Sequence, residues 1–467
     1  MRVRIPERFR NTFVYLVTVF FTQLGSFILL PILTRFLVPS QYGEYAIALA
    51  VGGLIGMFAS SWMRNVGFRF YFDAKTAGTT RAFFWSVQGL QTFTVTVMFA
   101  VTILAMSLSA HPLVSLPTML ALAVMTVTGD LFTWAVTLLR GEQLSGRFAA
   151  AEMTSLAVRV AGTIAGLAIG FRSPAFLFLA AAGAAGLGAL VAVTALERRL
   201  MGPLRIRLGP LLQIAVRGPS ALPFSIGEWL NRLSDRLILS FLSTAGVVGV
   251  YSAGQSMGDR LVAGLVQAVF MMAWPDVLNA WTDGGIERAR VAIQRYIQIF
   301  LTLTVGPVVA LVLYAGTLIK LLGQSYQGAV HVVAVIGLAT WVRGFGSCFN
   351  RHYELNKNYR TLSGITLAGA ALNVGLTFLL VPGLLGLGAA LATLISQVIV
   401  AIVFVLARDR DLVAFPMADA GFVLLGVAVP AAVAWPLFGA SVTGIVVFAL
   451  GYTAIMGAVW MRRFRRA

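Results

Sequence analysis

Polar clusters, glycines and prolines divide the chain into long apolar stretches, most of them of 20 residues or more. An α-helix of about 20 residues, rising 1.5 Å per residue, crosses the roughly 30 Å hydrocarbon core of a bilayer. The pattern therefore predicts an all-α polytopic membrane protein with about fourteen transmembrane helices. Their expected limits are 12–34, 44–66, 82–108, 113–139, 148–170, 174–196, 218–242, 247–274, 291–313, 328–349, 361–381, 386–407, 418–437 and 442–461.

The distribution of Lys and Arg supports this division. Of 35 such residues, 26 fall on the side of the N-terminus and six within spans, while Arg35, Arg172 and Lys320 fall on the opposite side. Cytoplasmic loops of membrane proteins carry an excess of positive charge. We therefore expect both termini to be cytoplasmic, because adding or removing one helix would scramble the alternation from that point onward.

Composition narrows the class of protein further. Apolar residues make up 59% of the chain and charged residues 11%, which excludes a soluble enzyme, a disordered protein and a disulfide scaffold. The net charge of +18 is explained by loop charges that orient the chain, so no nucleic-acid partner is expected. The single cysteine, Cys348, and three widely separated histidines predict neither an internal disulfide nor a metal site. The first apolar run continues past Pro31 without a cleavage site, which predicts a permanent first helix.

Two lobes are expected from the longest basic connection. They span 1–196 and 218–407, joined by a cytoplasmic linker at 197–217 and followed by two additional helices at 408–467. With an offset of 206 residues, Gly43 aligns with Gly249 and Tyr45 with Tyr251. A duplicated bundle is typical of alternating-access transporters. We therefore predict two pseudo-repeated six-helix bundles plus two C-terminal helices.

Three segments resemble the polysaccharide and oligosaccharide flippases of the MOP exporter superfamily. They are FILLPILTRFLVPSQYGEYAIALAVGGLIG at 27–56, RLSDRLILSFLSTAGVVGVYSAGQSMGDRL at 232–261, and the segment 355–399 with Asn356, Lys357 and Asn373. The resemblance implies two bundles around a central cavity in the bacterial inner membrane. It also implies translocation, without catalysis, of polyprenyl-diphosphate-linked oligosaccharides to the outer leaflet for cell-surface polysaccharide biosynthesis. The expected partners are this lipid-linked oligosaccharide, membrane lipids, and a polysaccharide polymerase with its export machinery.

Ionisable side chains inside the predicted spans are the candidate functional groups. Glu228, Arg232, Asp235 and Arg236 share one helical stripe, since their spacings are i, i+4, i+7 and i+8. Asp259 and Arg260 lie about 12 Å of helical rise beyond Tyr251. Such groups are costly in lipid and usually face a cavity or a partner. The stripe therefore favours a water-filled cavity. The alternative is internal pairing of Glu228 with Arg232 and of Asp235 with Arg232 or Arg236.

Guanidinium groups match phosphate oxygens and stay charged, so arginines are the candidate ligands for a diphosphate. The candidate substrate-binding residues are Arg232, Arg236, Arg260, Arg343, Arg35 and Arg64. Arg35 and Arg64 also fit interfacial anchors, and Arg343 could reach the cytoplasm by snorkelling. Glu228, Asp235 and Asp259 are candidates for binding a driving H⁺ or Na⁺, and no other cofactor is expected.

Three alternative functions stay open. A multidrug exporter of the same superfamily would share the fold, but six arginines within spans fit cationic drugs poorly. A flippase for a peptidoglycan-precursor lipid has closer chemistry. A membrane polysaccharide polymerase or ligase would need a sizeable outer loop with catalytic residues, and the longest predicted outward loop spans only 314–327. No GxxxxGK[ST] phosphate loop is present, so ATP hydrolysis by that route is not expected.

Overall fold

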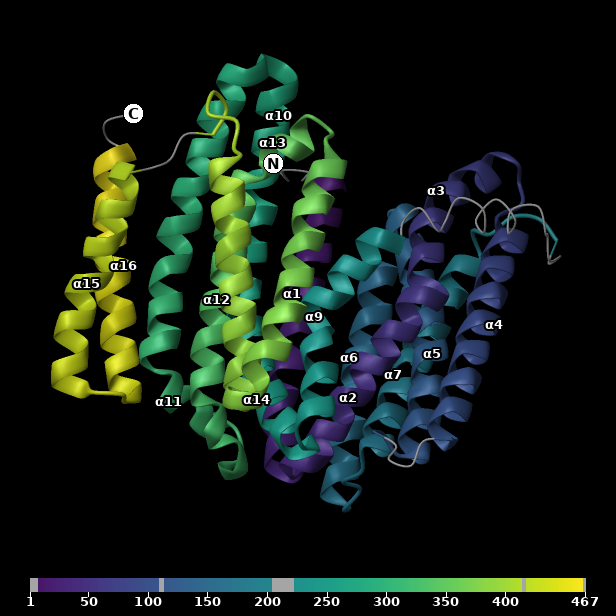
Figure 1. Cartoon of the computed structure of the whole chain (residues 1–467). Helices are drawn as coiled ribbons and strands as arrows, with labels where there is room; N and C mark the ends of the chain where they lie inside the picture. The colour runs from purple at the N-terminus through teal and green to yellow at the C-terminus, as the bar shows by residue number, and fades with distance from the viewer. Residues whose placement is uncertain (1–6, 109–112, 204–221, 414–416, 465–467) are drawn as a thin grey trace, which may run out of the picture. The chain divides into compact units, whose positions relative to one another are not determined.

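A computed structural model describes residues 7–108, 113–203, 222–413 and 417–464 (Figure 1). Within these ranges all regular secondary structure is helical, as the apolar pattern predicts. Nine helical stretches of the described chain are long and apolar enough to cross a membrane, and two shorter apolar helices follow near the C-terminus. The chain is therefore an all-α multi-pass membrane protein, whereas the count of fourteen spans stays a prediction.

The first half of the chain forms separate, regularly capped helices. Proline occupies the first turn of α2, α5 and α7, where its missing N–H loses no hydrogen bond. Gly78 and Gly170 follow the ends of α3 and α6 with positive φ. The bounds are α1 Glu7–Phe36, α2 Pro39–Gly56, the π-helix η1 Met57–Ser61, α3 Trp62–Thr76, α4 Thr80–Ser107, α5 Leu116–Gly141, α6 Ser145–Ala168, α7 Pro174–Glu197 and α9 Leu222–Leu242.

Two long helices of the second half are interrupted. Helix α10 would extend about 104 Å if it were straight, but Gly285 breaks it with φ 61°. Helix α14 is broken in the same way at Leu385, with φ 49°. Each therefore contains two of the predicted spans. The bounds are α10 Ala245–Leu313, α11 Ala315–Leu318, η3 Ile319–Leu321, η4 Gln324–Ala329, α12 Val330–Phe349, α13 Arg351–Leu355, α14 Tyr359–Leu406, α15 Met417–Phe438 and α16 Val442–Phe464.

The chain folds into two compact units, Met1–Gly249 and Val250–Ala467. In unit 1, α7 packs along both α5 and α6, and glycine permits close approach, because a Cβ on Gly188 would meet the Phe132 ring. The core of this unit contains the fully buried Trp134 and Phe84, whose rings stack. Most of the predicted linker, residues 204–217, lies outside the described residues, and the predicted lobe limits stay predictions.

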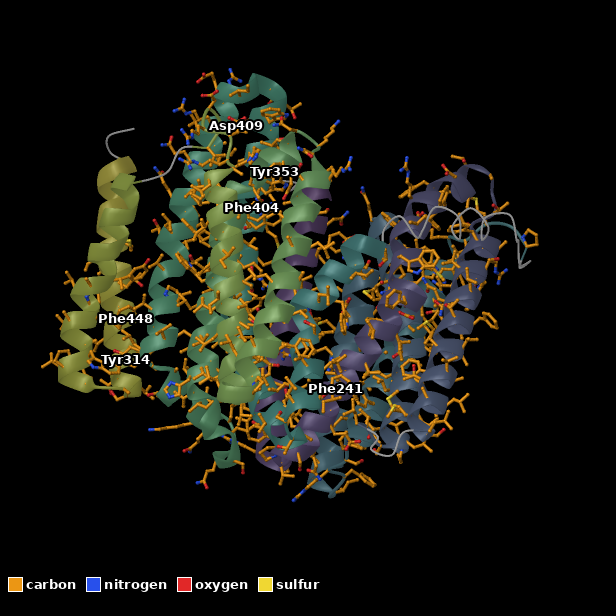
Figure 2. The ribbon with its side chains drawn as sticks, viewed as in Figure 1. Phe241, Tyr314, Tyr353, Phe404, Asp409 and Phe448 are labelled. Atoms are coloured by element: carbon orange, nitrogen blue, oxygen red, sulfur yellow. The ribbon has the colours of Figure 1, made fainter. Side chains whose placement is uncertain are left out.

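Unit 2 is built from α12 packed along α14 and from the pair α15 and α16. Its core contains the fully buried Phe300 and Phe349. Phe448, labelled in Figure 2, belongs to the same core. Phe448 of α16 packs against Tyr314, the residue that follows α10. The C-terminal helices are therefore an integral part of this unit.

The aligned glycines of the proposed repeat contact each other's helices within unit 1. A Cβ on Gly43 would lie 1.8 Å from the Ala245 carbonyl oxygen, and a Cβ on Gly249 would lie 1.9 Å from the Pro39 carbonyl oxygen. Pro39 and Ala245 are themselves separated by the offset of 206. The contact is therefore reciprocal, as expected where two copies of one duplicated segment meet about a local two-fold axis.

Candidate functional site

A π-helix ends three residues before the candidate Arg64. Segment η1 joins α2 to α3 without a break and loosens the regular backbone hydrogen bonding. Its carbonyl groups receive additional donors: the Trp62 indole donates to the Phe58 oxygen at 2.7 Å, and the Thr94 hydroxyl of α4 donates to the Ala59 oxygen at 2.7 Å. Because π-helical turns are frequent at functional positions, this segment marks a candidate site.

Arg64 forms an ion pair with Asp130 of α5. The guanidinium Nη1 contacts the Asp130 carboxylate and also donates to the Ser60 hydroxyl at 3.1 Å. Asp130 is 8% exposed, and its second oxygen, Oδ2, is buried without a hydrogen-bond partner in the described structure. Asp130 lies about 16 Å of helical rise from the end of α5 at Gly141, close to mid-span depth.

Asp130 was not among the predicted site residues. The signal that could have found it is a lone carboxylate in the apolar run LPTMLALAVMTVTGDLFTWAVTLL, since an isolated acid at membrane depth usually has a partner. Arg64 is close to it only through the packing of α3 and η1 beside α5, which no spacing in the sequence reveals. The pairing makes the interfacial-anchor explanation unnecessary for Arg64.

The stripe on α9 is partly described. Asp235 is buried, and its carboxylate accepts the backbone N–H of Arg236 at 2.8 Å, while Arg232 is exposed. All three side chains take part in further interactions. The side chain of Glu228 lies outside the described residues. Helix α9 is held against α2 by the Trp229 indole, which donates to the Ala50 carbonyl at 3.2 Å.

A second ion pair lies in unit 2. Arg343 Nη2 of α12 is 3.2 Å from Asp259 Oδ1 of α10, and the Thr340 hydroxyl donates to the same oxygen at 2.8 Å. Both charged side chains are substantially exposed, at 45% and 43%. Each residue lies about 20 Å along its helix, where exposed charge requires a polar surrounding. The structure thus joins a predicted phosphate ligand to a predicted ion-binding carboxylate.

Arg260 and Arg35 are the remaining candidate arginines. Arg260 follows Asp259 in α10, is exposed, and takes part in interactions of its own. Arg35 is exposed in the last turn of α1, where a cation favourably meets the negative end of the helix dipole. Its position at a helix end agrees with an interfacial anchor.

A buried arginine outside the candidate list stabilises the end of α12. Arg351 is 7% exposed and pairs with Glu354 at 2.5 Å. Its guanidinium carbon lies 4.5 Å from the centre of the Phe270 ring and 4.9 Å from that of Trp274. Arg351 therefore makes cation–π contacts away from solvent, which is typical of a residue that stabilises the fold.

The next residue, His352, is also buried. Burial lowers its pKa, while the Phe349 carbonyl oxygen and the nearby Asp409 oppose that shift. The neighbouring Tyr353 packs beside Phe404, with ring centres 6.4 Å apart. Burial of His352 therefore favours its neutral form.

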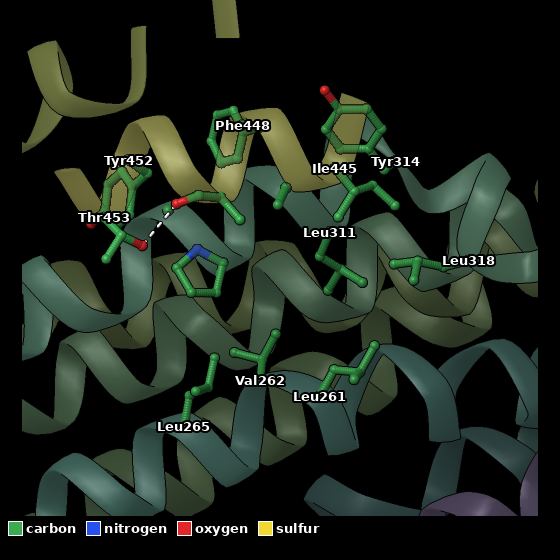
Figure 3. A pocket seen from close by; sticks show the side chains of 14 residues that line it. Leu261, Val262, Leu265, Leu311, Tyr314, Leu318, Ile445, Phe448, Tyr452 and Thr453 are labelled. Atoms are coloured by element: carbon green, nitrogen blue, oxygen red, sulfur yellow. Dashed lines mark hydrogen bonds between the residues drawn. The ribbon is translucent and has the colours of Figure 1, made fainter. Parts of the chain in front are cut away.

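An apolar cavity of about 320 Å³ lies in unit 2 between both parts of α10 and α16 (Figure 3). Its lining includes Leu261, Leu311 and Phe448, and the hydroxyl of Tyr452 is turned to the Thr302 carbonyl oxygen at 2.6 Å. The volume lies at the lower end of the roughly 300–1,000 Å³ usual for ligand pockets. In the part of the chain that is described, no three His, Cys, Asp or Glu side chains gather as metal ligands would.

Comparison with known families decides the classification. Residues 32–331 match the family described as "Polysaccharide biosynthesis protein". The chain belongs to this family. No curated protein sequence matches the chain.

Solved structures show which fold this polysaccharide biosynthesis protein shares. The lipid II flippase MurJ in an inward closed conformation superposes with a TM-score of 0.77 at 13% identity, covering 97% of this chain and 99% of that one. An inward-facing multidrug resistance MATE transporter of the MOP superfamily gives 0.56 at 17% identity, covering 85% and 93%. An outward-facing MATE transporter gives 0.53 at 16% identity, covering 82% and 92%. The chain therefore has the fold of MOP-superfamily transporters.

Proposed function

We propose that the protein is a flippase that moves polyprenyl-diphosphate-linked oligosaccharide repeat units from the cytoplasmic to the outer leaflet of the bacterial inner membrane. The observation that carries this proposal is that Arg64 and Arg343, which lie within candidate membrane spans, are each beside a single carboxylate. Family membership in polysaccharide biosynthesis supports the sugar part of the substrate. The fold supports transport by alternating access rather than catalysis.

The ion pairs suit a site that binds an anion only part of the time. An unpaired arginine in a membrane is energetically costly, so a carboxylate partner compensates its positive charge while no substrate is bound. A diphosphate offers more negative charge and a fork of oxygens that matches the guanidinium, so it can replace the carboxylate. Arg232, Arg236 and Arg260 remain further candidate ligands, and Arg35 would attract the head group at the membrane surface.

The apolar cavity supplies a second element that the proposed substrate requires. A polyprenyl carrier brings a long hydrocarbon chain, and the lining between Leu261 and Phe448 offers it few polar groups. Residues of α16 close one side of the cavity. This gives α16 a role in holding the carrier lipid within unit 2.

A driving ion completes the proposed mechanism. Asp235 and Asp259, together with Glu228, are the carboxylates proposed to take up H⁺ or Na⁺. Asp259 is substantially exposed and within reach of solvent, whereas Asp235 is buried. Neutralising each in turn as Asn or Gln tests the coupling, and unchanged transport at every imposed gradient would refute it.

A peptidoglycan-precursor lipid is the second candidate substrate, because the lipid II flippase has the same fold over nearly its whole length. Both substrates join a sugar to an isoprenoid through phosphate, so the proposed arginine–phosphate contacts could form with either. The sugar itself distinguishes them, and only a measurement on the lipid-linked intermediates separates the two.

The test compares cells with and without the gene for lipid-linked oligosaccharide on each leaflet. Accessibility to an added glycan-cleaving enzyme in intact spheroplasts reports the sidedness. We expect accumulation confined to the inner leaflet, restored by the wild type and by Arg410→Ala, which removes an exposed loop charge, but not by Arg232→Ala or Arg260→Ala.

Other results would overturn the proposal in identifiable ways. Normal sidedness with altered drug tolerance would indicate a multidrug exporter. Completed translocation with unpolymerised product would indicate a polymerase or ligase. Accumulation of peptidoglycan precursor instead of the oligosaccharide would select the second candidate substrate.

A further inference from the structure

The interior of unit 1 contains buried polar atoms that its own hydrogen bonds leave unpaired. Besides Asp130 Oδ2, they include both amide atoms of Gln91 and Oε1 of Gln88, on α4. Gln91 is completely buried and Gln88 is 5% exposed. Buried polar groups are satisfied in the great majority of cases, so several unsatisfied atoms in one region call for a physical explanation.

Two hydrogen bonds show that these atoms lie at the same level of the bundle. Trp134 Nε1 of α5 is 3.4 Å from the Phe84 oxygen of α4, so antiparallel packing places Gln88 level with Asp130, one turn along each helix. The Thr94 hydroxyl reaches the Ala59 oxygen of η1, which places Gln91 level with the start of α3. The two amides, the carboxylate and Arg64 therefore occupy one polar layer.

Charge balance limits what this layer can hold. Arg64 and Asp130 cancel each other while they are paired. If Arg64 turns to a phosphate, Asp130 is left as an uncompensated buried anion, which is strongly unfavourable in a low-dielectric interior. One proton from water removes that charge, and the oxygen to receive it, Oδ2, already lacks a partner.

We propose that Asp130 is a proton-binding counter-ion of Arg64, so that binding of a diphosphate head group at Arg64 is coupled to uptake of one proton at Asp130. The proton comes from solvent, binds Oδ2, and finds acceptors in the amide oxygens of Gln88 and Gln91, directly or through water. When the head group leaves, Arg64 returns to the carboxylate and the proton is released. This inference rests on the proposed function, because the anion it invokes is the head group of the lipid.

The surroundings support a movable Arg64 beside a fixed Asp130. Arg64 is 21% exposed at its side chain, whereas that of Asp130 is 10% exposed and belongs to a regular helix. Arg64 follows the π-helix by three residues, where the loosened backbone can change its hydrogen bonding at small cost. The guanidinium is therefore the partner able to move.

Other charged groups on the helices around α5 have their own partners or lie on other turns. Lys75 pairs with Glu142 at 2.7 Å, and Arg81 pairs with Glu197 at 2.9 Å. Glu44 of α2 accepts the Ser115 hydroxyl at 2.6 Å. The remaining charged side chains on these helices are Arg69 and Asp73 of α3, Arg140 of α5, and Arg147, Glu152 and Arg159 of α6.

The counter-ion relation is tested without substrate by infrared spectroscopy of the purified full-length protein at neutral pH. Arg64→Gln should gain one C=O band of a protonated carboxyl group that is absent from the wild type, from Arg64→Lys and from Arg64→Gln/Asp130→Asn. Elution as a single species on gel filtration confirms that each variant is folded. Absence of the new band in folded Arg64→Gln would overturn the proposal.

The coupling to the anion is tested on the wild type with farnesyl diphosphate as the probe. Calorimetry in two buffers of different ionisation enthalpy gives the protons taken up per molecule bound. The wild type and Asp73→Asn, which changes an exposed carboxylate of α3, should take up about one proton more than Asp130→Asn. Comparison with Asp130→Asn cancels protons taken up by the diphosphate itself.

The outcomes separate the two proposals. Equal proton uptake by wild type and Asp130→Asn, with binding intact, would overturn the coupling and leave the flippase proposal standing. If the wild type binds no farnesyl diphosphate, the proposed binding of the diphosphate by arginine would be overturned, and the coupling to proton uptake with it. A difference of one proton together with the infrared band would establish both.

Discussion

Replacing Gly43 by alanine tests the reciprocal contact between the duplicated segments. The added Cβ would lie 1.8 Å from the Ala245 carbonyl oxygen and 2.7 Å from its carbon. Real Cβ atoms essentially never come closer than 3.0 Å to another heavy atom, so the two backbones must separate by more than about 1 Å. Both atoms belong to backbone, so no side chain can rotate away to relieve the overlap.

The magnitude follows from two opposing effects. Overpacking of this kind costs about 1–3 kcal/mol. Alanine also favours a helix over glycine by about 0.8–1.0 kcal/mol, which offsets part of that loss. We therefore expect Gly43→Ala to lower the free energy of unfolding by up to about 2 kcal/mol. Gly56→Ala, on the same helix with no atom within 4 Å of the new Cβ, should be neutral or stabilising.

The second glycine supplies a stricter test. Gly249→Ala should cost a similar amount, because its Cβ would lie 1.9 Å from the Pro39 oxygen, whereas the control Gly246→Ala meets only the Thr244 hydroxyl at 3.7 Å. Once one added Cβ has moved the two helices apart, the second added Cβ overlaps less with the opposite backbone. The double variant should therefore lose clearly less stability than the two single losses combined.

The assay is unfolding of the purified protein by sodium dodecyl sulfate in mixed micelles, followed by tryptophan fluorescence. Wild-type stability in Gly43→Ala would show that the close backbone contact does not form. Strictly additive losses in the double variant would show that the two glycines do not share one interface. Either result would refute the reasoning.

Three further predictions concern unit 2. Arg351→Lys should lower the free energy of unfolding by about 1–2 kcal/mol in the same assay, because an ammonium loses the planar stacking on Phe270 and Trp274, and unchanged stability would contradict this. Burial lowers the pKa of His352 in the folded protein, so below the unfolded-state pKa near 6.5 the unfolded chain binds more protons than the folded one. The free energy of unfolding should therefore fall as the pH drops from about 6.5 toward the pKa of His352 in the folded protein. His352→Gln should flatten that part of the pH profile. Reversing the charge of Asp259 or of Arg343 alone should lower the free energy of unfolding, and exchanging both charges should restore most of that loss. The restored free energy should be no more than about 1 kcal/mol, because the pair is exposed. A double variant as unstable as the less stable single variant would contradict the pairing.

Much of the fold could be predicted from sequence because a bilayer imposes a one-dimensional constraint. A span must be apolar over about 20 residues, so its position is visible without knowing its neighbours. The helical breaks at Gly285 and Leu385 separate predicted spans, as the loops between 274 and 291 and between 381 and 386 require. The shared stripe of Glu228, Arg232, Asp235 and Arg236 on α9 stays a prediction, because Asp235 is buried, Arg232 is exposed, and the side chain of Glu228 lies outside the described residues.

Contacts between side chains of different helices could not be predicted in this way. Asp130 lies 66 residues from Arg64, and Arg343 lies 84 residues from Asp259, so no helical spacing connects either pair. The unpaired amide of Gln91 is equally invisible, because whether a glutamine finds a partner depends on which helix packs beside it. The sequence by itself predicted an all-α membrane protein and showed which segments are apolar and long enough to cross a bilayer. Only the tertiary structure decided which opposite charges meet, because ion pairing depends on distance in space, and helix packing sets that distance.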